Sequence, residues 1–306
     1  MIWLAVATLT VSGGDFDPGA AADRAMELLA QHYVDSGRLD AVLRELKRKR
    51  PDYLRLRRGA FVEAITTDLR RAGRDNHLYV RSVPKPRDPG FDAQWRAQER
   101  KDEKDSNFGF RRVEQLDGRI GYVQLVQFME PARSVPTANA VMAFLANSEA
   151  LIIDLRGNGG GYGGLPEYLA SYFFDVEPTL LSTVYFDAER QSFAQTHSIP
   201  TIVGPRRVGI PLAVLVDGGT ASAAEWLAYT LQAFDKAIIV GERSAGGAHM
   251  NTFYALGQGL RISISTAIPI NPRTRSNWEQ VGITPDVACS SEKALSCAIK
   301  ALDGRR

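Results

Sequence analysis

Three continuous apolar runs, separated by glycine-rich turns, dominate the middle of the sequence. They lie within residues 150–155, 212–216 and 237–241, where Asp154 is the one charged residue. Apolar runs of this length without alternation predict strands that are buried on both faces, as in a parallel sheet. Apolar residues at helical spacing follow the second run from Thr220 onward. The pattern therefore predicts a mixed α/β fold in which helices connect parallel strands.

The N-terminal part of the chain has a helical pattern instead. Apolar residues recur at helical spacing in three stretches between residues 18 and 71, and Gly37, Pro51 and Gly59 separate the stretches. A polar turn containing His77 follows. We expect a small helical bundle over residues 15–83 that ends in this turn.

The charged, proline-containing stretch 84–106 is typical of an exposed linker. It separates the helical part from a predicted α/β domain over residues 107–306. The length of 306 residues is enough for one large domain and a smaller unit. The net charge of +2 implies no nucleic-acid partner, and the basic residues between 44 and 58 are explained as the solvated side of helices.

Residues 1–14 contain an apolar run that is too short to span a bilayer. The run resembles the core of a signal peptide, although it lacks a basic start and a clean cleavage motif, and a buried first strand is the alternative. We expect export to the periplasm or to the outside, with no stable membrane span. Cys289 and Cys297 make no metal signature and form either two thiols or a small disulfide, depending on the compartment.

Ser222 lies where the strand 212–216 gives way to a helix. A hydroxyl in the first turn of a helix faces unpaired N–H groups and the positive end of the helix dipole. The N–H of Ala223 can point into the same space and stabilise an oxyanion. The alternative is that Thr220 or Ser222 only caps the helix.

The strand 150–155 ends in a glycine-rich loop, residues 156–164. Crowded glycines indicate positive φ angles or a close approach of the backbone to a ligand. The loop lacks the ending of a P-loop and the spacing of a dinucleotide-binding fingerprint, so a nucleotide site is disfavoured. An oxyanion hole built from glycine N–H groups that face Ser222 fits better.

A serine nucleophile needs a base, and the chain has four histidines. They are His32, His77, His197 and His249. A histidine in a polar turn, such as His77, is otherwise a surface or capping residue.

Four motifs in a fixed order carry a resemblance to a known family. They are DLRGNGGG from Asp154, TASAAE from Thr220, VGE from Val240 and NWEQVGITPD from Asn277. Together they resemble the C-terminal (tail-specific) processing peptidases over nearly the whole chain. Within that family the chain is most similar to the branch of the tricorn protease core and the interphotoreceptor retinoid-binding protein modules, which often lacks a peptide-binding (PDZ) insertion. The resemblance implies a crotonase-like sheet domain of ββα and βαβ units, preceded by a helical bundle.

The resemblance also implies a catalytic set. Ser222, three residues before Glu225, matches the nucleophile. Gly247 stands where the lysine-dependent branch carries its base, so a Ser–Lys dyad in its usual form is ruled out. The tricorn-like branch instead implies His77 as the base and Glu279 as the third group, acting on His77 directly or through a hydroxyl.

Two further assignments follow from the same resemblance. Gly160 or Gly161, together with the N–H of Ala223, match the oxyanion donors. His249 is the rival base, because it lies two residues after the missing lysine.

The implied function is that of a serine endopeptidase or tail-processing peptidase acting on peptides or unfolded proteins, with no metal or cofactor. The alternative is a non-catalytic binding module for apolar ligands or peptides on the same fold. An esterase of the α/β-hydrolase type is disfavoured, because Thr220 and Ala224 stand where G-x-S-x-G needs glycines. The natural substrate, the cleavage specificity and the oligomeric state stay open.

Overall fold

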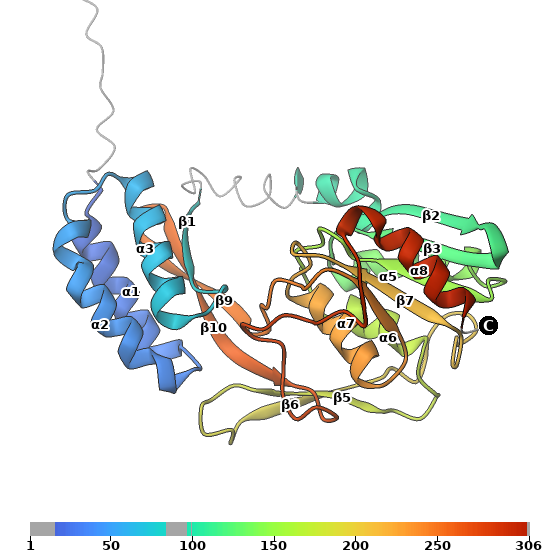
Figure 1. Cartoon of the computed structure of the whole chain (residues 1–306). Helices are drawn as coiled ribbons and strands as arrows, with labels where there is room; N and C mark the ends of the chain where they lie inside the picture. Colours follow the sequence, from blue (N-terminus) through green and yellow to red (C-terminus); the bar gives the residue numbers. More distant parts are fainter. Residues whose placement is uncertain (1–15, 84–96, 99, 305–306) are drawn as a thin grey trace, which may run out of the picture.

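The three apolar runs form the centre of a six-stranded sheet in the computed structural model, which describes residues 16–83, 97–98 and 100–304 (Figure 1). β4 (Ala150–Asp154), β7 (Leu212–Val216) and β8 (Ile238–Gly241) are buried at every position. The strand order is β11-β8-β7-β4-β3-β2. β3 (Ile120–Leu125), β4, β7, β8 and β11 (Val287–Ala288) run parallel, and β2 (Phe110–Leu116) pairs antiparallel with β3.

Helices cover both faces of this sheet. α5 (Pro131–Phe144), α6 (Leu165–Ser171) and α7 (Ala223–Ala233) pack on one face, and α8 (Ala294–Asp303) packs on the other. α5 begins at Pro131, a residue suited to the first helical position, and the side chain of Glu130 accepts the N–H of Ala132 (3.2 Å). The prediction of a mixed α/β fold is confirmed.

The N-terminal helices are α1 (Pro18–His32), α2 (Ser36–Tyr53) and α3 (Arg58–Gly73). Their apolar faces do not form a core by themselves. The same buried cluster contains residues of β1 (Tyr79–Ser82), β9 (Met250–Gly257) and β10 (Leu260–Ile270). The helical unit predicted over residues 15–83 therefore shares its core with strands from the C-terminal third of the chain.

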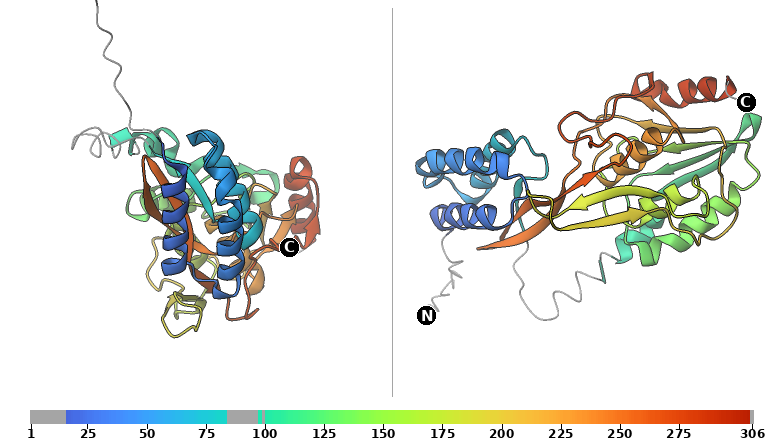
Figure 2. Two further views of the ribbon diagram at one scale, coloured as in Figure 1. Left: turned by 90° about the vertical axis from the view of Figure 1, so that its left-hand side faces the viewer. Right: turned by 90° about the horizontal axis from the view of Figure 1, so that it is seen from below.

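β9 and β10 belong to a second, antiparallel sheet. Its order is β1-β10-β5-β6, and β9 also pairs with β10. β5 (Leu180–Tyr185) and β6 (Phe193–His197) are not among the strands that the sequence predicts. Figures 1 and 2 show β10 running from the helices α1–α3 to the β5–β6 hairpin beside α7. This sheet therefore links the N-terminal helices to the rest of the molecule.

The structure describes part of the predicted linker and does not describe the N-terminal apolar segment. Residues 100–105 of the predicted exposed linker are helical, and Glu103 is buried there in a two-pronged ion pair with Arg133 (2.6 and 2.8 Å). The segment 84–96 and the apolar segment 1–14 lie outside the described residues. Cys289 and Cys297 form a disulfide. None of the helices in the described part of the chain is both long and apolar enough to cross a membrane.

Candidate active site

Ser222 has a strained backbone at the start of α7. Its φ of 54° and ψ of −120° lie outside the regions that residues with a side chain usually adopt. Two hydrogen bonds hold the turn before it. The Thr220 hydroxyl donates to the carbonyl oxygen of Leu155 (2.8 Å), and the N–H of Ala221 donates to that of Asn158 (2.9 Å). The turn after β7 is thereby fixed against the loop after β4.

A buried carboxylate, Glu225, ties Ser222 to the turn after β8. Its Oε2 accepts the N–H groups of Ser222 (2.9 Å) and Gly247 (2.9 Å). Its Oε1 accepts the N–H of Gly246 (2.7 Å) and the hydroxyl of Ser244 (2.5 Å). These bonds replace the water that the carboxylate loses on burial. Glu225 enters the predicted catalytic set only as the residue that locates Ser222 in its motif, although a glutamate three residues after a capping serine predicts this kind of turn.

The glycine loop lies so close to Ser222 that side chains have no room. A Cβ on Gly160 would lie 2.7 Å from the Cβ of Ser222. A Cβ on Gly161 would lie 1.9 Å from the carbonyl oxygen of Phe128, with which Gly161 forms a parallel bridge. Both glycines have positive φ, 96° and 135°. The positive φ angles agree with the sequence prediction, and the close approach is to the Phe128 and Ser222 segments of the chain itself.

The N–H groups near the serine differ in their availability. The N–H of Gly160 donates to Oδ1 of Asn158 (2.9 Å). The N–H groups of Gly161 and Ala223 have no acceptor within the described residues. Of the three expected oxyanion donors, two are therefore free and one is engaged.

His77 lines the same open cleft as Ser222, Gly160 and Gly161, with a volume of about 960 Å³. The ring Nδ1 of His77 is buried and has no hydrogen-bond partner in the described part of the chain. Burial lowers the pKa of His77 below its usual value, and the opposing effect of the Asp75 carboxylate is smaller. The neutral imidazole, which can accept a proton, is therefore favoured.

The ring of His77 fills the space beside Gly247. A Cβ on Gly247 would lie 3.1 Å from Cε1 of His77. Position 247 is where the family resemblance places a lysine base, so a side chain there would point at the imidazole. His77 makes no described hydrogen bond to Ser222. In structures without substrate such bonds are often long or absent, and they form in the substrate complex.

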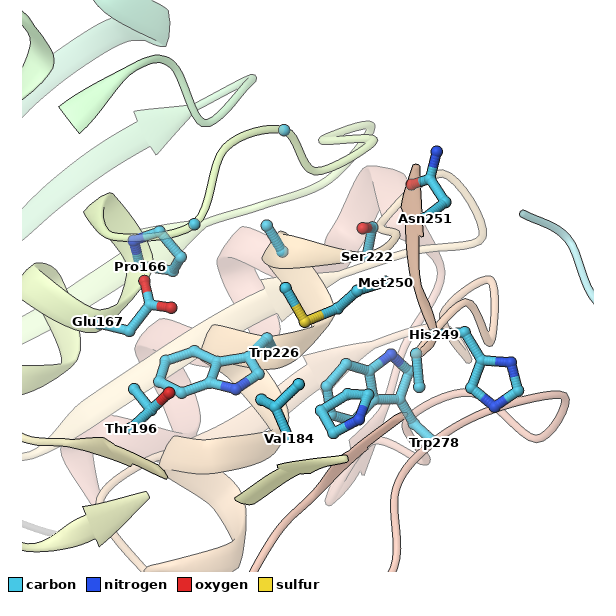
Figure 3. Close-up of a pocket in the computed structure, with 15 residues that line it drawn as sticks. Pro166, Glu167, Val184, Thr196, Ser222, Trp226, His249, Met250, Asn251 and Trp278 are labelled. Carbon is cyan, nitrogen blue, oxygen red and sulfur yellow. The ribbon is translucent and has the colours of Figure 1, made fainter. Parts of the chain in front are cut away.

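His249 is engaged elsewhere. Its Nδ1 lies 3.1 Å from Oδ2 of Asp75 and 4.0 Å from Oε2 of Glu279. Burial alone would lower the pKa of His249, but the bond to Asp75 and the charge of Glu279 outweigh burial and raise it. Figure 3 shows the imidazole pointing away from Ser222. The structure thus places the two candidate bases in different surroundings.

Asp75, which the sequence analysis does not single out, joins three parts of the molecule. Its Oδ1 accepts the N–H of His77 (2.8 Å), and its Oδ2 is bonded to His249 and to the hydroxyl of Tyr33 (3.3 Å). Burial would raise the pKa of Asp75, but the hydrogen bond from His249 and its charge outweigh burial and lower it. An aspartate two residues before the turn histidine is typical of a side chain that caps its own turn, and this spacing was the available signal.

Glu279 lies with His249 and not with His77. Its Oε2 accepts the N–H groups of Ala248 (2.7 Å) and His249 (3.0 Å). Burial raises the pKa of Glu279, while the charge of His249 opposes the rise. No described hydrogen bond joins Glu279 to His77, so contact between them would require another group.

One cluster of side chains has the composition of a metal site. Ligand atoms of Asp75, His249 and Glu279 all lie within 4.8 Å of one another. Each of these atoms already has a partner in the protein, either another member of the cluster, the Tyr33 hydroxyl or a backbone N–H. The described contacts therefore account for the cluster as a hydrogen-bonded ion pair.

A smaller cavity of about 190 Å³ opens on the other side of Ser222 (Figure 3). Its walls are polar and apolar in about equal measure and come from the glycine loop, α6, α7, β5, β6, β9 and β10. They include Val184, Trp226 and Trp278, and one carboxylate, Glu167. Burial raises the pKa of Glu167. The cavity has the size of a pocket for one side chain, with aromatic and aliphatic walls and one carboxylate.

Residues 119–289 match the profile of peptidase family S41. The chain belongs to this family. The match covers more than half of the sequence and confirms the family that the four motifs predict.

Similar proteins agree with the S41 assignment. The chain is 34% identical over 179 residues to the chloroplastic carboxyl-terminal-processing peptidase 3 of Arabidopsis thaliana, covering 57% of this chain and 33% of that protein. The S41 chain thus matches about a third of the length of that relative.

Two solved structures share the fold. A peptidase from Parabacteroides merdae has a TM-score of 0.66 at 18% identity, over 95% of this chain and 97% of that one. The photosystem II D1 C-terminal processing protease has a TM-score of 0.56 at 18% identity, over 94% and 97%. At such identities these two likenesses support the S41 fold alone.

Proposed function

We propose that the chain is a serine peptidase that cleaves peptides or unfolded proteins through an acyl-enzyme on Ser222, with His77 as the general base. The observation that carries the proposal is the buried, unpartnered Nδ1 of His77 in the cleft that Ser222 lines. A serine hydroxyl is a weak nucleophile at neutral pH and needs such a base. The pKa of His77, lowered by burial, keeps the imidazole ready to accept a proton.

The reaction would proceed in two stages. The Oγ of Ser222 attacks the peptide carbonyl carbon while His77 takes the hydroxyl proton. His77 then gives this proton to the leaving amine, the C–N bond breaks, and an ester to Ser222 remains. Water, deprotonated by His77, hydrolyses the ester and restores the serine.

The negative charge on the carbonyl oxygen would be bound by the N–H groups of Gly161 and Ala223. These two groups have no acceptor in the described part of the chain. Gly160 would act through Asn158, to which its N–H donates, by fixing the loop rather than by touching substrate. Each oxyanion donor typically lowers the barrier by about 3 kcal/mol.

Asp75 and Glu279 would position the base rather than react. Asp75 holds the backbone of His77, and Glu279 holds the backbone of Ala248 and His249 beside Asp75. In this arrangement Glu279 acts on His77 through His249 and Asp75. A purely binding role is not favoured, because ligand binding alone needs neither a strained serine nor a free base.

The proposal is tested by labelling with a serine-reactive fluorophosphonate, together with cleavage of casein. The wild type should be labelled and should cleave casein, and Ser222→Ala should do neither. His77→Gln should lose labelling by about a hundredfold or more, as expected for loss of a general base. Equal labelling of His77→Gln and wild type, with loss in His249→Gln, would assign the base to His249 instead.

We also propose that the protein is exported to the periplasm or to the outside of the cell. A disulfide between Cys289 and Cys297 persists in an oxidising environment, which supports export. Mass spectrometry of the protein isolated from its native cell fractions checks this. Two free thiols in a cytosolic fraction would contradict it.

A further inference from the structure

The small cavity beside Ser222 contains a carboxylate that no basic side chain of the described residues neutralises. Glu167, in the first turn of α6, lines this cavity together with Trp226 and Trp278. Its Oε2 accepts the N–H of Gly164, and its Oε1 accepts no hydrogen bond from another described residue. Burial raises the pKa of Glu167, and no basic group in the described part of the chain opposes the rise. The carboxylate therefore lacks a counter-charge there.

Glu167 and Ser222 lie on opposite sides of the cavity. Figure 3 shows the two side chains apart, with the ring of Trp226 below the space between them. Trp226 follows Ser222 by four residues and stands one helical turn, about 5.4 Å, further along the same face of α7. Oε1 of Glu167 lies beside the glycine loop, where a Cβ on Gly163 would be 3.5 Å from it. The cavity thus has the nucleophile at one end and a carboxylate at the other.

The cavities on the two sides of Ser222 differ in the groups that border them. The small cavity is bordered by Gly161 and Ala223, whose N–H groups are the proposed oxyanion donors. The large cleft is bordered by His77, the proposed donor of a proton to the leaving amine. The leaving group therefore belongs in the large cleft. The residue whose carbonyl group is attacked then has its side chain in the small cavity.

A cationic side chain fits the carboxylate end of the cavity. A buried carboxylate without a counter-charge is costly, and an ammonium group that donates a hydrogen bond to it favours the ionised form. Tryptophan rings such as those of Trp226 and Trp278 pack against the apolar stem of a lysine and attract its charge. The imidazole of His249 also lines the cavity, but its Nδ1 is paired with Oδ2 of Asp75 (3.1 Å).

We propose that Glu167 makes this cavity select a lysine side chain on the residue whose carbonyl group Ser222 attacks. The proposal rests on the proposed peptidase function and names its substrate class, peptides and unfolded proteins with a lysine immediately before the cleaved bond. Oε1 of Glu167 binds the ammonium group, while Oε2 keeps its bond to the N–H of Gly164. Glu167 touches the substrate in this role and takes no part in the proton transfers.

Matched peptides test this on the wild-type protein without any mutation. The peptides differ only in the residue before the cleaved bond, which is lysine, norleucine or glutamine. Norleucine keeps the four-carbon chain of lysine and lacks its charge. We expect kcat/KM to be about tenfold or more higher for the lysine peptide than for the norleucine peptide, as for one hydrogen bond between charged groups.

Two results with these peptides would overturn the proposal. The first is a norleucine peptide that is cleaved as well as the lysine peptide or better. The second is a glutamine peptide that is cleaved better than the lysine peptide. This second result would assign the cavity to a neutral amide, whose oxygen can accept the N–H of Trp278, a buried donor with no acceptor in the described part of the chain.

Glu167→Gln removes the charge and keeps the turn. Glutamine serves as well as glutamate at the third position of a helix, where the side chain accepts the N–H of the capping residue. The ratio of kcat/KM for lysine to that for norleucine should fall to within about twofold of unity. A purely structural role of Glu167 would lower both values and leave their ratio unchanged, and that result would overturn the proposal.

Glu177→Gln is the matched control for this variant. Glu177 is an exposed carboxylate in the loop after α6 and does not line the cavity. Its ratio for lysine over norleucine should equal that of the wild type. An equal fall of the ratio in Glu177→Gln and Glu167→Gln would overturn the assignment to Glu167, because it would show a general effect of negative charge.

A binding experiment separates this proposal from the peptidase proposal. Fluorescence anisotropy with Ser222→Ala measures the affinity for the labelled lysine and norleucine peptides without any chemistry. Tighter binding of the lysine peptide, lost in a Ser222→Ala, Glu167→Gln double variant, supports the pocket even if the wild type cleaves nothing. Equal affinity for the two peptides, in a protein that cleaves neither, overturns it. Fluorophosphonate labelling, which involves no peptide, tests the nucleophile separately.

Discussion

Two glycines, one beside Ser222 and one beside His77, leave little or no room for a side chain of their own. Gly160 admits no Cβ because Ser222 is too close, and Gly247 admits one only at 3.1 Å from the His77 ring. The two glycines therefore leave the space that the side chains of Ser222 and His77 occupy. The absence of a side chain at these two positions is as important for the arrangement of the site as the polar side chains that are present.

Gly247→Ala should disturb the base without disturbing the fold. The added methyl group meets the imidazole of His77 at 3.1 Å, so the ring must shift by a few tenths of an ångström or more. Since misplacement of a catalytic group by about 1 Å can cost a hundredfold, we expect fluorophosphonate labelling to slow by about tenfold or more. The thermal midpoint should change little, because the substitution leaves the Gly247 N–H bond to Glu225 in place.

Gly59→Ala is the matched control for this variant. Gly59 lies in α3 with no atom within 4 Å of its added Cβ. Its labelling rate should equal that of the wild type. Normal labelling of Gly247→Ala would mean that His77 does not act from the position that it occupies.

At the scale of elements, the site is built where parallel strands end. β3, β4 and β7 are neighbours, and the segments after their carboxyl ends meet at Phe128, the glycine loop and Ser222. Open α/β sheets bind ligands at such an edge. Glu225, in the first turn of α7, extends the arrangement to the turn after β8.

Glu225→Gln should weaken both the fold and the site. The carboxylate accepts three backbone N–H groups and one hydroxyl, and an amide has only one oxygen with which to replace it. We expect the free energy of unfolding to fall by about 3 kcal/mol, since bonds to a buried charged group are strong. Urea denaturation measures this, and labelling of Ser222 should slow in parallel.

Glu63→Gln is the control, because Glu63 is an exposed residue of α3. Its unfolding free energy should stay within about 0.5 kcal/mol of the wild type. A comparable stability of Glu225→Gln would show that the hydrogen bonds of Glu225 do not hold the turn.

The elements that the sequence predicts well are those with a strong local pattern. The buried runs at 150–155 and 212–216, and the glycine loop between strand and helix, carry their structure in adjacent residues. β6 is exposed at every position but one, so no apolar pattern marks it. Asp75 and His249 meet only because β1 pairs with β10, a contact between distant parts of the chain that no local pattern encodes. The approach of Glu279 to His249 also joins residues that are distant in the sequence, so no local pattern predicts it.

At the scale of the whole molecule, a buried ion pair joins the N-terminal part to the α/β part. Asp75 has no more than 1% of its surface exposed and His249 7%. The pair also contacts Tyr33, at the end of α1. Folding of the helices and assembly of the site are therefore coupled through Asp75 and His249, which must be in the correct protonation states.

Stability should depend on pH through His249. Its pKa is raised in the folded protein, so its contribution is fully present below the ordinary histidine value of about 6.5 and is lost as the pH rises through the raised value. Asp75 has a lowered pKa, so its contribution is lost only as the pH falls through that low value. We expect His249→Gln to lower the free energy of unfolding by about 3 kcal/mol at pH 6 and by less at pH 9.

Urea denaturation over this pH range measures the difference. His197→Gln, an exposed change on β6, should show the wild-type pH dependence. A loss of stability in His249→Gln that is constant from pH 6 to pH 9 would contradict an imidazolium at this position.

The pairing of β1 with β10 has a consequence for the chain as it is being made. His77 emerges early from the ribosome, but the strand that holds β1 in place spans residues 260–270 and emerges late. A nascent chain can already contain Ser222 and its glycine loop while β1 has no partner strand. His77 can therefore take up its place beside the Ser222 segment only after residues 260–270 have been made and have paired with β1.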